Sequence, residues 1–313
     1  MKSFICPTMA VDKIHFKEHC LNNVVGGSAT YAALASSIFC ETALSSIVGN
    51  DFPLDYLDLL ESKGVDISGV YKSKRKSFHW EARYSADLGK VTTIKNEMNA
   101  FEDYDAKKVK PLSKDSFAAF VSNIDPEIQG KIVKNLPKNT IKILDSMELW
   151  MIEKRDHLIK VLEDVDVFTI SEGEAKFLVG KDLPLPEMIE TLMLLGPKVI
   201  VYKKGEHGLS VYGKLGNFIV PSYPLVYAVD PTGAGDVLGG AIAGVLSALG
   251  RFDMRSMRTA ALLGSILASY TVEAYGTEIL ESITKEEVLN RTSMFLTQLP
   301  CEKLESDLEI LRD

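Results

Sequence analysis

One short run in the last third of the chain places small residues between two carboxylates, an order that suits phosphate chemistry. The run reads Asp230-Pro231-Thr232-Gly233-Ala234-Gly235-Asp236. Aromatic and β-branched residues in 217–229 favour a strand before it, and the small apolar residues of 237–249 have helical spacing after it. We therefore expect a strand-to-helix turn, with Asp230 as the N-cap residue and Pro231 in the first helical turn.

The start of this helix is suited to binding an anion. The backbone amides of Gly233, Ala234 and Gly235 lack helical acceptors there, and the helix dipole adds positive charge, so together they predict an anion hole for phosphate. Asp236 is suited to take the proton from a hydroxyl that attacks the phosphorus, and an unperturbed carboxyl with a pKa of about 4 suffices for a late proton transfer. One alternative is a core helix whose glycines serve only packing. A dinucleotide-binding turn is weaker, because the run misses the G-x-G-x-x-G spacing by one residue.

Together with three earlier segments, this run resembles the signature of the ribokinase-like (phosphofructokinase-B type) kinases of sugars and nucleosides. Segment 25–32 (VGGSATYA) resembles the di-glycine substrate turn of that family, and segments 48–51 (VGND) and 64–66 (GVD) resemble its two early landmarks. The resemblance covers nearly the whole chain. It implies an enzyme that uses ATP and Mg²⁺ to phosphorylate an alcohol group, with Asp236 as the general base.

The resemblance also implies where the nucleotide and the metal bind. Glu174 corresponds to the acid of the N-x-x-E motif that organises magnesium, although Ser171 stands where Asn is usual. Lys203 takes the Thr position of the T-x-G-x-x-G turn, where a lysine reaches the triphosphate as a point charge. The alternatives are a helix N-terminal acid for Glu174 and an ordinary turn residue for Lys203. The other nucleotide-binding residues expected are Gly205, Gly208, Thr232 and Gly276. The sequence leaves open whether a monovalent cation binds near Asp230.

On the acceptor side, the resemblance implies a carboxylate and a glycine turn that hold the substrate. Asp12 corresponds to the family's sugar-hydroxyl carboxylate, with a surface turn residue as the alternative, and Gly26 and Gly27 form the di-glycine turn. Tyr31 stands where the family has Asn, and a tyrosine offers one hydroxyl and a ring instead of an amide. The pocket is therefore expected to depart from a standard ribose or fructose site.

The remaining sequence supplies the elements that must position these residues. Short apolar segments alternate with helical stretches, which is typical of a parallel sheet covered by helices on both faces. These expected strands are 2–6, 43–48, 117–122, 141–145, 167–170 and 199–202. The expected fold class is therefore α/β. With the resemblance, it becomes a three-layer sandwich with a mostly parallel central sheet plus a small antiparallel β lid.

The lid is expected where the residue pattern changes to strand-like alternation. The large nucleotide- and substrate-binding domain is expected to comprise residues 1–11, 21–69 and 100–313, and the lid residues 12–20 and 70–99. Trp80, Arg83 and Tyr84 are expected to close over the substrate, with Arg83 against an anionic group. In the alternative, Trp80 and Tyr84 bury against a second lid, which makes the protein a homodimer through the lid.

The composition of the chain limits the kinds of partner and location that are expected. The 313 residues carry a net charge of −8, which argues against a nucleic-acid partner, and no stretch reaches the roughly 18–20 apolar residues of a membrane span. Four cysteines without a C-x-x-C pair, and an N-terminus unlike a signal peptide, predict free thiols and a cytoplasmic location. His15, His19 and Cys20 have metal-like spacing, but nothing nearby in the sequence supplies a further ligand.

The function favoured by the sequence is ATP-dependent phosphorylation of a sugar or sugar-like small molecule. A nucleoside acceptor is the alternative within the same fold. A non-catalytic ligand-binding protein is less favoured, because sensing needs no base such as Asp236, and a Rossmann-type oxidoreductase is a distant fourth. The sequence does not name the substrate, the preferred phosphoryl donor or the oligomeric state.

Overall fold

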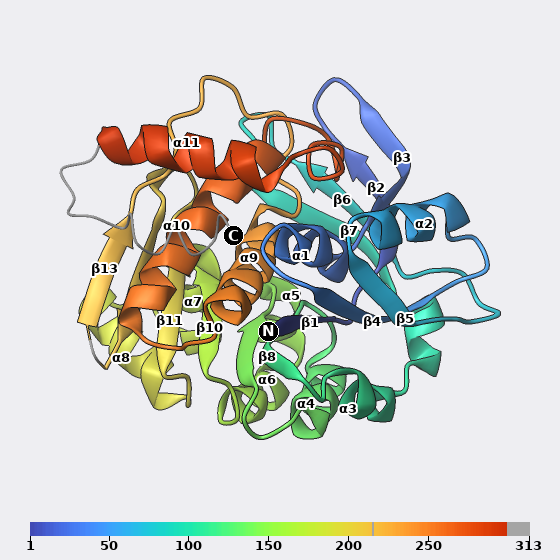
Figure 1. Ribbon diagram of the computed structural model, residues 1–313, viewed down its shortest axis with the longest axis horizontal. Helices are drawn as coiled ribbons and strands as arrows, with labels where there is room; N and C mark the ends of the chain where they lie inside the picture. Colours follow the sequence, from blue (N-terminus) through green and yellow to red (C-terminus); the bar gives the residue numbers. More distant parts are fainter. Residues whose placement is uncertain (215, 299–313) are drawn as a thin grey trace.

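The computed structural model describes residues 1–214 and 216–298, and its largest element is a nine-stranded sheet (Figure 1). The strands lie in the order β13-β12-β11-β10-β9-β8-β1-β4-β5. Neighbours from β11 to β5 pair in parallel, and β12 and β13 add an antiparallel hairpin at one edge. The strands are β1 Lys2–Cys6, β4 Thr42–Val48, β5 Val65–Lys72, β8 Ser116–Val121, β9 Ile141–Asp145, β10 Val167–Ser171, β11 Val199–Lys203, β12 Leu209–Gly213 and β13 Gly216–Val220.

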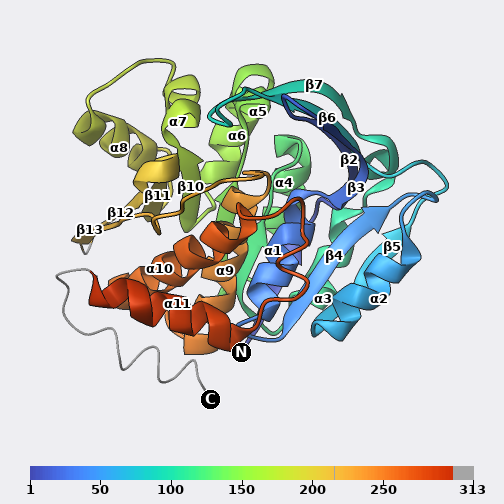
Figure 2. The ribbon, with the colours of Figure 1, turned by 90° about the horizontal axis from the view of Figure 1, so that it is seen from above.

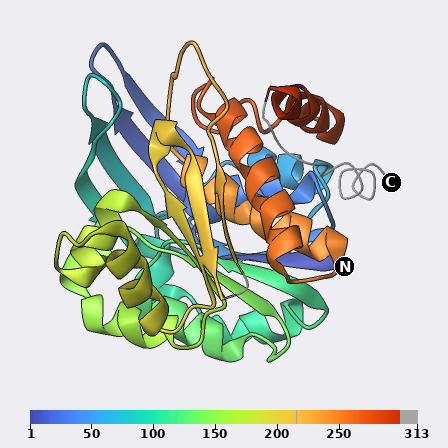
Figure 3. The same ribbon diagram turned by 90° about the vertical axis from the view of Figure 1, so that its left-hand side faces the viewer.

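Helices cover both faces of this sheet, so the expected three-layer α/β sandwich is confirmed (Figures 1 and 3). One layer contains α1 Ser28–Ser37, α2 Leu54–Ser62, α9 Ala234–Leu249, α10 Met254–Thr271 and α11 Lys285–Thr297. The other contains α3 Val109–Leu112, α4 Pro126–Asn135, α5 Glu148–Glu153, α6 Arg155–Leu162, α7 Glu172–Val179 and α8 Leu185–Leu194. Among the described residues, no helix is long and apolar enough to cross a membrane.

Small residues bring α9 into close contact with α1. A Cβ atom on Gly240 would lie 2.2 Å from the carbonyl oxygen of Ala32, and one on Gly244 would lie 2.8 Å from that of Ser36. Each contact joins residues one helical turn further along both helices, so α1 and α9 run side by side in the same direction. Their N-terminal ends therefore meet, and each end carries one of the glycine turns singled out in the sequence.

A second, four-stranded sheet projects from the large one (Figure 2). Its strands are β2 Ala10–His15, β3 Cys20–Gly26, β6 His79–Tyr84 and β7 Val91–Glu97, in the order β3-β2-β6-β7. It consists of two antiparallel hairpins, as expected for the lid, but the inner strands β2 and β6 pair in parallel.

The boundaries expected for the lid differ from those of the second sheet. The sheet includes all of β3, which the sequence analysis assigned in part to the large domain, and β5 continues in the large sheet as far as Lys72. Strand β3 was missed because two polar residues, Asn22 and Asn23, are exposed in its middle. Asn23 also has a positive φ of 54°, and the pairing register between β2 and β3 shifts at this point. The usual alternation of strand residues is interrupted there.

The strand expected before the glycine turn is also shorter than predicted. Strand β13 ends at Val220, and the chain then has no helix or strand until α9 begins at Ala234. Aromatic and β-branched residues such as Tyr223 and Val226 therefore belong to a connecting segment. Tyr223 packs against Phe295 of α11, and Val226 and Tyr227 are exposed, so these side chains satisfy no strand pattern.

Candidate active site

Helix α9 begins three residues later than expected. The N-cap residue is Gly233, with a positive φ of 79°, and not Asp230. The Asp230 carboxylate is 1% exposed and accepts hydrogen bonds from the amides of Thr232 at 2.9 Å and Gly276 at 3.0 Å. Because it binds two amides from segments far apart in the sequence, Asp230 fastens the loop after α10 to the turn before α9.

Tyr31 lies directly beneath this turn. A Cβ atom on Gly233 would lie 2.3 Å from the Tyr31 ring, and one on Gly276 would lie 3.9 Å from its hydroxyl. Tyr31 is only 2% exposed. It therefore supports the turn from below. Glycine at position 233 is required twice, by the positive φ and by the ring beneath it.

The first amides of α9 are oriented as an anion-binding helix start requires. The Ala234 amide donates to the Pro231 carbonyl at 3.3 Å, whereas no described residue accepts from the amides of Gly233 or Gly235. Backbone N–H groups at such a position are normally satisfied by a cap, by water or by a ligand. The arrangement thus leaves two donors available beside Asp236.

Asp236 lies in the first turn of α9, opposite the start of α1. The Ser28 side chain at the start of α1 acts to lower the pKa of this carboxyl group. Burial raises the pKa of Asp236 to about 7, and the nearby Asp145 carboxylate adds to the rise, while Lys203 opposes it. The expectation of an unperturbed carboxyl is therefore wrong, because the start of α9 and its neighbours shield this partly exposed side chain from most of the water.

Three neighbouring parallel strands end at the same edge and bring Asp145, Ser171 and Lys203 together. Asp145 ends β9, Ser171 ends β10 and Lys203 ends β11, and the register places Ser171 directly beside Lys203. Ligand sites of α/β sheets lie at this carboxyl edge. The residues thus converge although they are far apart in sequence.

The Lys203 ammonium lies between two carboxylates. Its Nζ atom lies 2.8 Å from Asp145 Oδ1 and 3.9 Å from Glu174 Oε2, and a Cβ atom on Gly235 would lie 3.3 Å from it. Burial disfavours the charged form, but Asp145 and Glu174 outweigh it and raise the pKa of Lys203. The lysine is therefore a fixed positive charge against the first turn of α9. Sequence reasoning missed Asp145, whose only signal was its place at the end of an apolar strand.

Glu174 serves as a helix cap and lies near Asp145 at the same time. Its Oε2 atom accepts from the Ser171 amide at 2.7 Å, and its own amide donates to the Ser171 hydroxyl at 3.2 Å, which is a capping box. Burial raises the pKa of this carboxyl. No group of three or more His, Cys, Asp or Glu side chains in the described residues has the arrangement of a metal site. Mg²⁺ keeps several waters and needs only one or two carboxylates beside phosphate oxygens, so Glu174 and Asp145 fit it.

The acceptor side centres on Asp12 of β2. Its side chain is buried, Oδ1 accepts from the Trp80 amide at 3.2 Å, and a Cβ atom on Gly26 would lie 2.2 Å from Oδ2. Burial raises its pKa to about 7, against hydrogen bonds from Trp80 and Gly27 that lower it. Gly27, with a φ of 88°, is the N-cap residue of α1 and touches the backbone of Thr8. Asp12 and the di-glycine turn therefore form one unit.

Strand β6 separates the lid residues onto two faces. Tyr84 shares a face with Trp80, and its hydroxyl accepts from the Thr232 hydroxyl at 3.0 Å, which links the small sheet to the glycine turn. The Trp80 indole N–H donates to Thr93, so this ring is held within the sheet. Arg83 is exposed and lies on the opposite face, beside Glu81. The structure therefore does not bring Arg83 to the substrate side, a consequence of the strand period of two.

The remaining expected nucleotide residues lie in two loops near α9. Gly205 and Gly208 form the turn between β11 and β12, where the Lys204 amide donates to the Gly208 carbonyl at 2.8 Å. No atom lies within 4 Å of a Cβ atom on Gly205, so this backbone is open to a ligand. Thr232 and Gly276 both bind Asp230, as described above, and thus belong to the turn itself.

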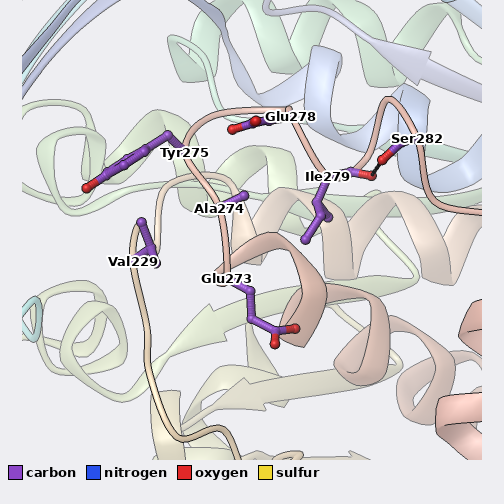
Figure 4. A pocket seen from close by; sticks show the side chains of 7 residues that line it. All are labelled: Val229, Glu273, Ala274, Tyr275, Glu278, Ile279 and Ser282. Atoms are coloured by element: carbon purple, nitrogen blue, oxygen red, sulfur yellow. Dashed lines mark hydrogen bonds between the residues drawn. The ribbon is translucent and has the colours of Figure 1, made fainter.

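A cavity of about 470 Å³ adjoins this turn. Figure 4 shows its lining, in which Val229 and Ile279 flank Ala274, with Glu273 and Glu278 on opposite sides. Its walls come from the residue before Asp230 and from the loop after α10. The lining residues are Val229, Glu273, Ala274, Tyr275, Glu278, Ile279 and Ser282. The cavity size is within the range of small-ligand sites.

Comparison with known proteins agrees with the resemblance seen in the sequence. The model of the family described as pfkB family carbohydrate kinase matches residues 5–284. A cytidine kinase of Thermococcus kodakarensis is 30% identical over 224 residues, which are 70% of this chain and 77% of that protein. A nucleoside kinase of Methanocaldococcus jannaschii is 26% identical over 259 residues, 80% of each chain.

Solved structures share the fold. A protein from E. coli described as a candidate ribokinase II, in complex with ATP and Mg²⁺, superimposes with a TM-score of 0.76 at 23% identity. The match covers 95% of this chain and 99% of that one. The large sheet, the two helical layers and the small projecting sheet are thus features of one known fold.

Proposed function

Because this chain belongs to the pfkB family of carbohydrate kinases, we propose that it transfers the terminal phosphate of ATP to a hydroxyl group of a nucleoside's sugar. The observation that carries the proposal is the start of α9. There a desolvated carboxyl, Asp236, lies beside two amides without acceptors, and the ammonium of Lys203 lies against the same turn. Phosphoryl transfer depends on positioned positive charge and a base, and this turn offers both.

Each residue of the site has a part in the proposed reaction. Asp12 holds the acceptor through its hydroxyls, so that one hydroxyl lies near Asp236. Asp236 accepts the proton of that hydroxyl as the oxygen attacks the phosphorus. The amides of Gly233 and Gly235 and the Lys203 ammonium stabilise the charge of the transferred group, and the amide of Ala234 joins them by leaving its long bond to Pro231.

Glu174 and Asp145 are the residues proposed to hold magnesium, chiefly through its waters. A bound Mg²⁺ neutralises phosphate charge and fixes the triphosphate. The turn at Gly205 and Gly208 offers backbone to the phosphates, and the cavity beside Val229 offers apolar walls to the donor base. Support for ATP and Mg²⁺ comes from the family and from the solved relative that contains both.

The choice of acceptor is supported by two relatives that match most of this chain. The cytidine kinase and the nucleoside kinase align over 70% and 80% of this chain. The site also departs from the family's sugar-reading residue, because Tyr31 replaces Asn and lies under the turn. The nucleoside alternative is thus placed ahead of the free sugar that the sequence analysis ranked first.

An acceptor panel tests this proposal. Purified protein with ATP and Mg²⁺ is assayed for ADP release with cytidine, inosine, adenosine, ribose and fructose, and products are identified by mass spectrometry. Nucleoside 5′-monophosphates are expected, with little product from free sugars. Sugar phosphates alone would reverse the order of the two acceptors. Absence of any phosphorylated product, with ATP still bound, would favour a ligand-binding protein.

A further inference from the structure

The cavity beside the glycine turn combines apolar walls with a carboxylate that is held in place. Val229, Ala274 and Ile279 supply the apolar surface, and Glu273 borders it (Figure 4). The backbone amide of Val229 donates to the Val272 carbonyl at 2.7 Å, so both sides of the cavity are fastened to one another near Asp230. The cavity is thus fixed relative to the phosphate end of the proposed site.

Arg291 of α11 fixes the position of Glu273. Its NH1 atom donates to Glu273 Oε2 at 2.6 Å and to the Ser269 hydroxyl at 3.0 Å. Its guanidinium lies 3.3 Å from the centre of the Tyr270 ring and 4.7 Å from that of Tyr223. Cation–π contacts on two rings leave the guanidinium little freedom. The Glu273 carboxylate is therefore positioned by Arg291, whose own position is fixed by the two tyrosine rings.

Only one oxygen of Glu273 is used by these contacts. Within residues 1–214 and 216–298, Glu273 accepts hydrogen bonds through Oε2, and Oε1 is left with its lone pairs. A carboxylate beside a cavity repels phosphate and base carbonyls, and it attracts N–H groups. A donor base with an exocyclic amino group therefore complements this wall, whereas a base without one does not.

We propose that Glu273 selects the phosphoryl donor by accepting a hydrogen bond from the amino group of its base. The inference rests on the proposed function, because it places the donor base in the cavity beside Val229. Adenine carries such an amino group, and purine riboside has the same ring system without it. A hydrogen bond to a charged group corresponds to a preference of about tenfold to a hundredfold.

Nucleotide binding tests the inference without requiring the acceptor to be known. Isothermal titration calorimetry with Mg²⁺ compares ADP with purine riboside 5′-diphosphate. We expect ADP to bind at least about tenfold more tightly to the unchanged protein. Glu273→Gln removes the charge and Glu273→Asp withdraws the carboxylate by one methylene, and both are expected to reduce the preference to less than threefold.

A matched control separates the position of Glu273 from the net charge of the protein. Glu286, in the first turn of α11, is exposed and is not among the lining residues of this cavity, so Glu286→Gln changes the net charge equally and is expected to keep the preference. Circular dichroism and thermal unfolding confirm that each variant is folded. Equal binding of both nucleotides by the unchanged protein, or a preference that survives both Glu273 substitutions, overturns the inference.

The same experiment distinguishes this inference from the proposed function. A base preference that depends on Glu273, in a protein that phosphorylates nothing in the acceptor panel, leaves the inference standing and removes the function. Phosphorylation that proceeds equally well with ATP and with purine riboside 5′-triphosphate overturns the inference and leaves the proposed function standing. Absence of binding by either diphosphate overturns the inference.

Discussion

The same structural feature positions the Asp236 carboxyl and makes its ionised form less favourable. The start of α9 and its neighbours hold this carboxyl in the site, but they also shield it from most of the water and raise its pKa to about 7. A base is effective only when it is ionised, and a base with a pKa near the working pH is also well matched to proton transfer. In the proposed reaction this shift matches Asp236 better to its part as the base, at the cost of an unfavourable charge in a poorly hydrated site.

Replacement of this carboxyl separates its catalytic part from its structural cost. Asp236→Asn is expected to lower turnover by about 10²-fold or more, because the amide accepts no proton, and to leave nucleotide affinity within about threefold. In the unchanged enzyme, kcat/KM is expected to rise with pH through about 7, since ionised Asp236 is the active form. Steady-state kinetics between pH 5.5 and 8.5 measure both. Near-normal turnover of the variant, or a flat pH profile of the parent enzyme, contradicts the assignment.

The same substitution is expected to stabilise the protein. A carboxyl whose pKa is higher in the folded than in the unfolded chain contributes most to stability below pH about 4, and that contribution declines as the pH rises through about 7. Asp236→Asn is therefore expected to raise Tm at pH 7.5 by about 2–4 °C, which corresponds to about 1 kcal/mol in a large domain. The gain should disappear at pH 4.5. Thermal unfolding of both proteins at the two pH values checks this sign, and a lower Tm of the variant at pH 7.5 contradicts it.

At the scale of elements, parallel strands β9, β10 and β11 bring three separate sequence positions together in one polar cluster. The register that pairs Ser171 with Lys203 also brings Asp145 to the same edge. Asp145 is buried, the Lys203 side chain is 17% exposed, and the two charged groups lie 2.8 Å apart, so neither is independent of the other. The pair therefore links the stability of the sheet edge to the charge available for catalysis.

Breaking this pair is expected to reduce both stability and activity, and removing both charges is expected to restore only stability. Lys203→Met leaves the Asp145 charge buried without its partner and is expected to cost about 3–5 kcal/mol. The double variant Asp145→Asn/Lys203→Met should recover most of that loss but remain at least about tenfold less active. Urea unfolding and turnover measure the two effects.

A more exposed pair, formed by the residues just before β10 and β11, provides the comparison. Lys198 and Asp166 lie 2.6 Å apart, but the Lys198 side chain is 67% exposed, so Lys198→Met is expected to change stability by less than about 1 kcal/mol. If Lys203→Met were equally mild, or if the double variant recovered full turnover, Lys203 would be an ordinary turn residue.

The elements themselves were largely predictable, because continuous apolar runs and helical spacing are local properties. The strands ending at Asp145, Ser171 and Lys203 were found within a residue. The pairing of Lys203 with Asp145 was not, since it depends on which strands are neighbours. The same holds for Tyr31 beneath Gly233, which depends on how α1 meets α9. The outward direction of Arg83 was available from the period of β6 but was overlooked in favour of its charge.

At the scale of the whole molecule, aromatic side chains join the small sheet to both loops of the proposed nucleotide site. The Phe16 ring at the end of β2 stacks on His19 at 4.8 Å and on Tyr84 at 5.6 Å, and it meets Tyr275 edge-on at 5.5 Å. Tyr275 borders the cavity beside Val229, and Tyr84 holds Thr232. The small sheet is thus fastened over the site from the acceptor side to the donor side.

This connection predicts how the proposed lid contributes to the reaction. Phe16→Ala removes the ring shared by all three contacts, so the small sheet should cover the site less completely and water should reach the donor more often. We expect the ratio of ATP hydrolysis to acceptor phosphorylation to rise at least about fivefold, and the KM for the acceptor to rise as well. Lys95→Ala, on the exposed β7 strand of the same sheet, where Lys95 pairs with Glu97 of that strand, is the control and should keep both values. The ratio is measured from ADP released against product formed in one reaction mixture. A Phe16 variant that transfers phosphate more slowly but hydrolyses no more ATP per turnover would show that the rings stabilise the sheet without excluding water, since a loss of packing alone lowers both reactions together.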